Sequence, residues 1–312
     1  MNPLIEDGRP FSARNIHYTL LIASILCFIG HGAFGIITKP IWCNYFAVFG
    51  IGHDLAYRLM PVLGTVDILM GLSLLIYPTR AVLGWLVVWG FVTASLRPLS
   101  GEPFAEFIER AGNFGAPLAL LLLSGGGTIG GKRGNTIGGE KGIRSWFTRL
   151  IPDSPINNSP ASSSDTRLAA ASPGAGRTPP TLATLVRLTL CLRIVVFLLL
   201  LGHGWLNLIG KKGLLLQYEH LGFSHPATTA LYAGLLEVLA AVAILVRPVR
   251  PLLLALLVWK AGTELFYPHW ELFEWVERSG SYGSLLALWM TIGATKYTSN
   301  AYAGNNKVIP SL

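Results

Sequence analysis

The sequence predicts an all-α, polytopic membrane protein made of two tandem four-helix transmembrane bundles. The first reason is composition: 52% of the residues are hydrophobic and only 13% are charged, against roughly a quarter charged in a typical soluble domain. The second is that eight apolar runs approach the roughly 20 residues needed to cross a bilayer. The third is that these runs fall into two groups of four, which together with the low charge argues against a soluble enzyme.

The elements follow one another in five segments. We expect a cytoplasmic tail over residues 1–16, a first repeat over 17–125, a linker over 126–182, a second repeat over 183–297 and a C-terminal tail over 298–312. The linker is rich in Gly, Ser, Pro and Asn, which cannot bury a core, so it is predicted to be flexible. Within it, residues 143–151 place apolar side chains along one helical stripe, which predicts an interfacial helix. The predicted spans are 17–38, 56–77, 81–97, 113–125, 184–209, 227–246, 250–267 and 282–296.

The basic residues predict the orientation. The two tails, the linker, the loops at Arg80 and at Arg247 and Arg250, and the flanking helix ends hold 16 of the 24 lysines and arginines but only five of the 16 acids. Short cytoplasmic segments carry such an excess, so both termini and the linker are expected in the cytoplasm. The net charge of +8 is thereby explained without a nucleic-acid partner.

The two groups of four helices resemble each other residue by residue. Gly30-His31-Gly32 recurs as Gly202-His203-Gly204, and Asp67 recurs as Glu237. Trp89 and Pro98 recur as Trp259 and Pro268, and Glu109-Arg110 recurs as Glu277-Arg278. An ordered series of matches at nearly constant offset indicates an internal repeat. Because each copy has four spans, we expect a parallel repeat about a pseudo-two-fold axis along the membrane normal.

Ionisable residues within the spans are the candidate ligand-binding residues, because each is costly in a bilayer. With a rise of 1.5 Å per residue, His203, Glu237 and Lys260 lie about 12 to 14 Å from the outer boundary, and Glu264 is one turn from Lys260. His31 and Asp67 lie at the same depths, but Gly90 and Ala94 replace the Lys and Glu. The second repeat is therefore expected to hold the fuller pocket, for a polar head group or a proton. Alternatively, these side chains only bond one helix to another, for about 1 kcal/mol.

Outer segments of both repeats carry further candidates. Glu109-Arg110 and Glu277-Arg278 stand beside aromatic residues, which predicts short amphipathic helices at the outer interface that form a docking surface, a lid or a structural anchor. Lys39 and Lys211 could attract an anionic head group or simply reach the interface.

Metal and haem sites are not expected. The three cysteines are far apart and form no C-x-x-C pair, which argues against zinc or dithiol chemistry. The Gly-His-Gly triplets could supply axial haem ligands. However, there is only one such histidine per repeat, in the first helix of each, so no haem and no covalent cofactor is expected.

A family resemblance adds to this interpretation. The pattern from Arg193 through Gly202 and Leu206 to Lys211, the Gly234 to Glu237 motif and the bend at Arg247-Pro248 resemble the DoxX family of small four-helix membrane proteins. The match is best over residues 187 to about 268. The first repeat departs from it, with Leu21 in place of the Arg and Asp67 in place of the Glu. The resemblance implies a bacterial cytoplasmic membrane, a quinone ligand and a quinone-linked redox partner such as a thiosulfate:quinone oxidoreductase.

Three functions follow from these observations. The first is a membrane subunit or scaffold that binds a quinone or lipid-like ligand near His203, Glu237, Lys260 and Glu264, at most an accessory subunit of an oxidoreductase. The second is a transporter or channel that uses Asp67 and Glu237 as proton or ion sites. The third is a structural assembly protein without a ligand. The lipid bilayer is the one certain partner, and the sequence leaves an oligomer open.

Overall fold

The described part of the molecule is helical. The structure, a computed structural model, describes residues 13–125, 146–150, 182–267 and 272–305. No β-strand occurs in these ranges, and their only β-type pairing is an isolated bridge between Thr79 and Arg149. The predicted all-α class is confirmed.

Five helices are long and apolar enough to cross a membrane. They are α1 (Ala13–Ile36), α3 (His53–Ile76), α4 (Arg80–Leu99), α8 (Leu182–Leu208) and α10 (Pro226–Val246). The remaining predicted spans correspond to α6 (Ala111–Gly125), α11 (Arg250–Glu264) and α13 (Ser279–Asn305). Helices α6 and α11 have 15 residues each, a rise of about 22 Å. The chain is therefore a membrane protein by its helices, with five spans where length and hydropathy both suffice.

Short helices connect the long ones. They are α2 (Trp42–Ala47), α5 (Phe104–Glu109), α9 (Lys212–His220) and α12 (Leu272–Glu277). The sequence predicted α5 and α12 but not α2 and α9. Gly50 and Gly222 follow α2 and α9 with φ angles of 72° and 85°. A side chain is disfavoured in this left-handed region, so glycine allows the chain to leave each short helix and enter the next span.

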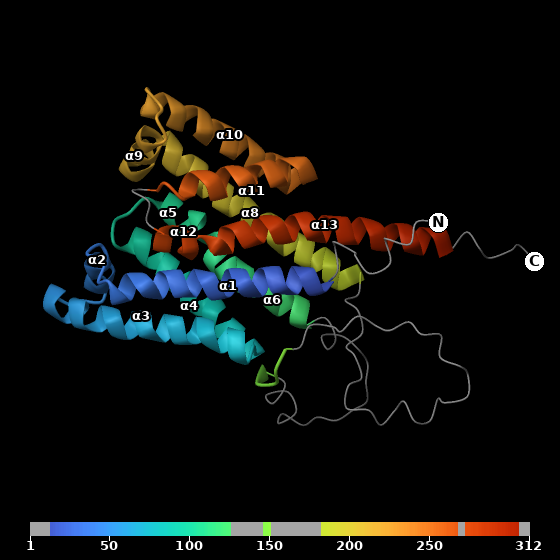
Figure 1. Ribbon diagram of the computed structural model, residues 1–312, viewed down its shortest axis with the longest axis horizontal. Coiled ribbons are helices and arrows are strands. Elements are labelled where there is room, and N and C mark those ends of the chain that lie inside the picture. The colour runs from blue at the N-terminus through green and yellow to red at the C-terminus, as the bar shows by residue number, and fades with distance from the viewer. Residues whose placement is uncertain (1–12, 126–145, 151–181, 268–271, 306–312) are drawn as a thin grey trace, which may run out of the picture.

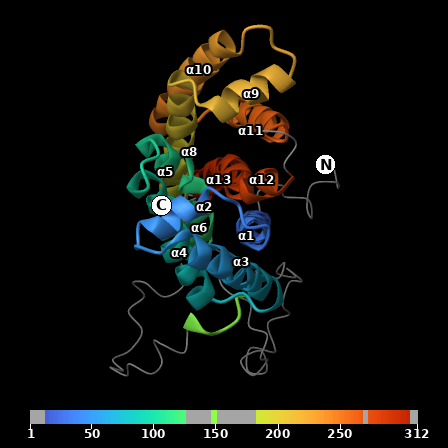
Figure 2. The ribbon, with the colours of Figure 1, turned by 90° about the vertical axis from the view of Figure 1, so that its left-hand side faces the viewer.

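The long helices lie side by side, with α1, α6, α8 and α13 at the centre (Figure 1). Helices α3 and α4 form one flank, and α10 and α11 form the other, as the end view shows (Figure 2). The central helices share a core of fully buried leucines such as Leu20, Leu188 and Leu288. Burial of each side chain stabilises the fold by about 1.5 to 3 kcal/mol in water. In lipid the hydrophobic effect does not bring helices together, and close packing of their side chains stabilises the association instead.

Glycines bring helix backbones into contact within each repeat. A Cβ atom on Gly32 of α1 would lie 2.5 Å from the Gly64 carbonyl oxygen of α3. At the corresponding place, a Cβ on Gly204 of α8 would lie 2.9 Å from the Gly234 oxygen of α10. No side chain fits at such distances, so the glycines of both Gly-His-Gly triplets set the helix spacing.

The two repeats interlock through their short helices. Helix α12 of the second repeat packs on α1, and α5 of the first repeat packs on α8. A Cβ on Gly30 would lie 2.4 Å from the backbone nitrogen of Glu277, and one on Gly202 would lie 2.3 Å from that of Glu109. Every such contact from one repeat to the other therefore has a counterpart in the reverse direction.

Three predicted boundaries need correction. Helix α1 begins at Ala13, inside the predicted tail 1–16, and α13 continues to Asn305, inside the predicted tail 298–312. Of the interfacial helix predicted over 143–151, only 146–150 is described, and it leaves the helical conformation after Trp146. The Leu150 amide instead donates to the Pro78 oxygen at 2.7 Å, and its side chain is buried. Residues 147–150 are therefore not helical, and the rest of the predicted interfacial helix and of the linker lies outside the described residues.

Candidate functional site

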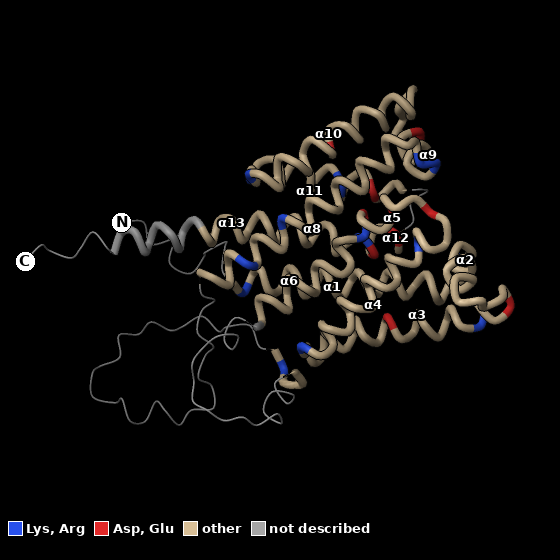
Figure 3. Tube along the Cα trace, turned by 180° about the vertical axis from the view of Figure 1, so that it is seen from behind, with Lys and Arg blue, Asp and Glu red and all other residues tan. Residues whose placement is uncertain are grey.

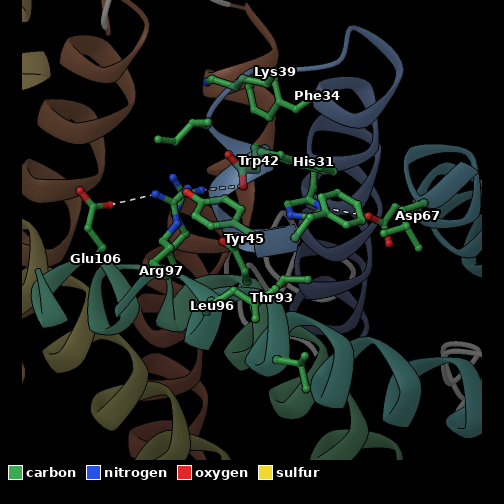
Figure 4. Close-up of a pocket in the computed structure, with 18 of the residues that line it drawn as sticks. His31, Phe34, Lys39, Trp42, Tyr45, Asp67, Thr93, Leu96, Arg97 and Glu106 are labelled. Carbon is green, nitrogen blue, oxygen red and sulfur yellow. Dashed lines mark hydrogen bonds and ion pairs between the residues drawn. The ribbon is translucent and has the colours of Figure 1, made fainter. Parts of the chain in front are cut away.

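A cavity of about 690 Å³ lies in the first repeat, within the 300 to 1,000 Å³ that small-molecule sites usually occupy. Helices α1, α2, α3 and α4 surround it, and Figure 4 shows it from inside. Its walls are largely aromatic and aliphatic, formed by side chains such as Phe34, Trp42, Tyr45, Phe46 and Leu63. The cavity can therefore accommodate a substantial apolar group.

Exposed side chains of the cavity lining lie on α3 and α4 and also beside α2, at Ile41 and Phe49. Val62 of α3 and Val92 of α4 line the cavity and are also 57% and 37% exposed. Both helices are candidate membrane spans, and their exposed apolar faces suit contact with lipid. The cavity is thus accessible from the side that would face the bilayer.

The inner end of the cavity is strongly charged. Arg97 contacts Glu102 at 3.0 Å and Glu106 at 3.1 Å, and Arg110 contacts Glu277 at 2.6 Å. The complete charged lining consists of Lys39, Arg97, Arg110 and Lys211 with Asp67, Glu102, Glu106, Glu274 and Glu277. Because Lys211, Glu274 and Glu277 belong to the second repeat, both repeats build this end of the site.

His31 lies between Trp42 and Asp67, and Tyr45 lies between it and Arg97 (Figure 4). Its Nδ1 atom is 2.8 Å from Asp67 Oδ2, and the Trp89 indole N–H donates to Asp67 Oδ1 at 2.7 Å. Both carboxylate oxygens of the buried Asp67 are thereby engaged. The His31 ring also packs on Trp42, with centroids 4.9 Å apart, which leaves Nε2 as the ring nitrogen without a hydrogen bond to the described residues.

The second repeat brings together the four residues predicted there. His203 Nδ1 is 2.5 Å from Glu237 Oε2, and Lys260 Nζ is 2.6 Å from Glu264 Oε1. The Tyr282 hydroxyl donates to Glu264 at 2.6 Å. All four predicted side chains are almost completely buried. They form an ion-paired cluster that links α8, α10 and α11.

The fuller pocket was predicted in the second repeat, whereas the described cavity of about 690 Å³ lies in the first. Beside Lys260 and Glu264 there is a void of only about 10 Å³, roughly the minimum that holds one water molecule. Ala94, the counterpart of Glu264, lines the large cavity of the first repeat. The Lys and Glu side chains thus occupy space in the second repeat that remains open in the first.

The Glu-Arg pairs of the outer segments lie between the repeats. Arg110 contacts Glu277 at 2.6 Å, and Arg278 contacts Glu109 at 2.7 Å. Burial alone would raise the pKa of Glu277, but the positive charges of Arg110, then His31 and Arg97, outweigh it and lower this pKa to about 2. Glu109 likewise has a pKa well below its usual value because Arg278 and nearby cations overcome the effect of burial. These residues anchor one repeat to the other and form no exposed docking surface.

Lys39 and Lys211 make a second reciprocal set. Lys39 Nζ lies 2.5 Å from Glu274, and Lys211 Nζ lies 2.5 Å from Glu106. The pKa of Lys211 is raised: burial alone would lower it, but Tyr267, Glu106 and Glu109 favour the charged form. Both lysines were expected at the outer boundary. Each lines the cavity and contacts a short helix of the other repeat: Lys39 contacts α12 and Lys211 contacts α5.

Sequence reasoning missed several residues of the site, notably Trp42, Tyr45, Trp89 and Arg97. The spacing of Trp42, Tyr45 and Phe46 at i, i+3 and i+4 could have indicated the amphipathic helix α2. The recurrence of Trp89 as Trp259 did not indicate that the Trp89 indole donates a hydrogen bond to Asp67.

Among the described residues, no group of three or more His, Cys, Asp or Glu side chains is placed to hold a metal ion. Cys27, Cys43 and Cys191 are free thiols. His31 and His203 each use Nδ1 for a carboxylate.

No protein-family model, curated protein or solved structure matches the chain. The resemblance to the DoxX family consequently stays an expectation from the motifs of the second repeat. The functional argument rests on the geometry of the cavity and its charged inner end.

Proposed function

We propose that the protein is an integral membrane subunit or scaffold that holds a quinone or lipid-like amphiphile in the cavity of its first repeat. The observation that carries this proposal is the polarity gradient of the cavity. Exposed apolar side chains of α3 and α4 line one part of the cavity, and paired charges surround the inner end. An amphiphile entering from the bilayer would keep its tail in apolar surroundings while its head group reaches hydrogen-bonding partners.

The charged end favours a head group without excess charge. Its cations contact carboxylates, as Lys39 does Glu274 and Lys211 does Glu106. An anionic head group would have to compete with these carboxylates for the same cations. A head group with hydrogen-bonding oxygens, such as a quinone ring, meets no such competition.

Within the same proposal, eight helices cross the membrane: α1, α3, α4, α6, α8, α10, α11 and α13. The repeats are related by a pseudo-two-fold axis along the membrane normal. The reciprocal pairs Arg110 with Glu277 and Arg278 with Glu109 support this symmetry. Lys and Arg gather at the helix ends opposite α2, α5, α9 and α12 (Figure 3), which supports a cytoplasmic location for those ends, the termini and the linker.

The proposed role is that of a DoxX-like accessory component of a redox complex in a bacterial cytoplasmic membrane. It holds no redox cofactor of its own and presents the bound amphiphile to a partner. The resemblance of residues 187 to about 268 motivates the redox partner, whereas the cavity motivates the ligand.

Extraction of the purified protein tests the ligand. The protein is purified in mild detergent, extracted with organic solvent and analysed by mass spectrometry, and its absorption spectrum tests for haem. Val92→Trp should block entry beside α4 and reduce the co-purified amphiphile at least tenfold. Gly262→Trp is the matched control, because Gly262 is the counterpart of Val92 and a Cβ there meets no atom within 4 Å. No stoichiometric amphiphile in the wild type, or equal amounts in both variants, would overturn the proposal.

A transporter is the second candidate, favoured by one observation. Arg110 and Asn113 line both the large cavity and the small void beside Lys260 and Glu264. Polar side chains thus lie between the two spaces, and Lys260 is 3.9 Å from Glu237. Proton flux in proteoliposomes that disappears in Glu237→Gln would support this candidate, and absence of flux in the wild type would reject it.

A further inference from the structure

His31 has the arrangement of a proton-exchanging histidine. Its Nδ1 atom is hydrogen-bonded to Asp67 Oδ2, and the Trp89 indole N–H donates to the other carboxylate oxygen, Oδ1. A carboxylate in this position fixes the orientation and tautomer of the ring and stabilises its protonated form. The second nitrogen, Nε2, is then left for a group in the cavity that His31 lines.

Charged side chains of both signs surround His31. Five carboxylates and four Lys or Arg side chains line the cavity. The groups around His31 are Asp67 from α3, Glu277 and Glu274 from α12, Arg110 between α5 and α6, Arg97 from α4, Tyr45 from α2, and Lys39 and Lys211.

The aromatic wall suits a planar head group. The Trp42 ring lies against His31, and Phe34, Tyr45 and Trp89 also line this part of the cavity. Aromatic side chains prefer stacked or edge-to-face contact with another ring. A planar ring that contacts Trp42 would bring an oxygen substituent toward the ring nitrogen of His31.

We infer that His31 exchanges a proton with a ring hydroxyl on the head group of the bound amphiphile. The inference rests on the proposed function, because it needs a ligand in the cavity. The O–H bond of the ligand breaks and an N–H bond forms at His31 Nε2, which leaves a ring oxygen anion paired with an imidazolium. The reverse step returns the proton, and no oxidant or other reactant takes part. Asp67 is a positioning residue, since it acts through His31.

The second repeat contains a matched histidine, His203, that is more deeply buried among the described residues. The side chain of His203 is 3% exposed, against 18% for His31. Its Nε2 lies 3.8 Å from Glu264, in a cluster whose neighbouring void holds about one water molecule. His31 is thus the more accessible of the two histidines for a phenolic ligand, and His203 is the matched comparison.

The test uses two probes with the same alkyl chain, a nitrophenol and its methyl ether. The ether cannot ionise, so its binding measures occupancy of the cavity alone, while the visible band of the nitrophenolate reports proton loss. On the wild-type protein, the bound nitrophenol should ionise at a pH at least one unit lower than on His31→Gln, a tenfold change in the equilibrium. His203→Gln should behave as the wild type.

Each outcome has a separate meaning. If the ether does not bind the wild type, the proposed function fails. If the ether binds wild type and His31→Gln equally but the nitrophenol ionises at the same pH on both, proton exchange is refuted. Asp67→Asn provides a second variant if His31→Gln does not fold: it should bind the ether and raise the pH at which the nitrophenol ionises. An unchanged ionisation in Asp67→Asn would also refute the inference.

Discussion

The two repeats place a histidine and an acid in contact at corresponding positions, but among the described residues the large cavity borders the first pair. His31 and Asp67 lie beside about 690 Å³ of space, whereas His203 and Glu237 lie beside a void of about 10 Å³. Lys260 and Glu264 fill the second repeat, where the first has Gly90 and Ala94. A buried polar pair therefore does not by itself indicate a ligand site, because the size of its neighbours decides whether anything can reach it.

The largest effect on ligand retention is expected when the Lys and Glu of the second repeat are introduced at the corresponding positions of the first. In Gly90→Lys with Ala94→Glu, the new side chains should occupy the cavity next to Asp67. A Cβ at Gly90 would lie 3.4 Å from Asn113 and Phe114, so little backbone movement is needed. Mass spectrometry should find the co-purified amphiphile reduced more than tenfold. Full retention of the amphiphile in a folded double variant would show that these two positions do not distinguish the repeats.

The next largest effect is on the stability of the buried ion-paired cluster in the second repeat. Lys260→Met leaves Glu264 and Glu237 buried without their nearest cation, which should lower the free energy of unfolding by about 3 to 5 kcal/mol. Chemical denaturation in detergent measures it. The matched control is Lys39→Met, because Lys39 also contacts a buried glutamate, Glu274, but its side chain is 27% exposed. Equal losses in the two variants would contradict the distinction, and adding Glu264→Gln to Lys260→Met should recover part of the loss.

A pH dependence follows from the contact between the repeats. The pKa of Glu277 is lowered from 4.5 to about 2, so its ion pair with Arg110 contributes fully above pH 4.5. This contribution is lost as the pH falls toward 2, and it amounts to about 3 kcal/mol. Thermal unfolding should therefore occur at progressively lower temperature in this range. The Glu277→Gln variant should be less stable than the wild type at neutral pH, and its unfolding temperature should fall less on acidification. An equal fall in both proteins would show that Glu277 is not the source of the pH dependence.

The smallest effect should separate the two corresponding tryptophans. Trp89→Phe removes a hydrogen bond to the buried Asp67, which should cost about 2 kcal/mol. Trp259 packs with Leu214 and Tyr218, and no hydrogen bond of its indole to an acid occurs in the described residues. Trp259→Phe should consequently cost less than about 1 kcal/mol. Similar unfolding free energies for the two variants would show that the bond to Asp67 adds little.

Part of the site was predictable because helix geometry converts sequence distance into depth. Counting residues from the outer end of each span placed His203 with Glu237 and His31 with Asp67, and both pairs are in contact. The same depths placed Lys260 beside Glu264. Helical class and repeat positions followed from apolar periodicity and ordered matches, which require no knowledge of how the helices pack.

The cavity could not be predicted, because depth does not reveal which side chains fill the space between helices. Two more polar residues in the second repeat suggested a richer site, but those residues close it. The contribution of Lys211 and Glu274 to the first-repeat cavity depends on the interlocking of α5 and α12. That arrangement is a tertiary property and leaves no local signal in the sequence.

The contact between Gly112 and Gly280 has a consequence for the origin of the fused chain. A Cβ on Gly112 would lie 2.8 Å from the Gly280 carbonyl carbon, and one on Gly280 would lie 2.6 Å from the Gly112 oxygen. Equivalent residues that meet each other in this way are typical of an isologous dimer, so a single bundle could pair with its own copy through the same surface. If two such bundles are joined in one chain, their sequences can diverge. The first repeat can then keep a cavity while the second is filled by paired charged side chains.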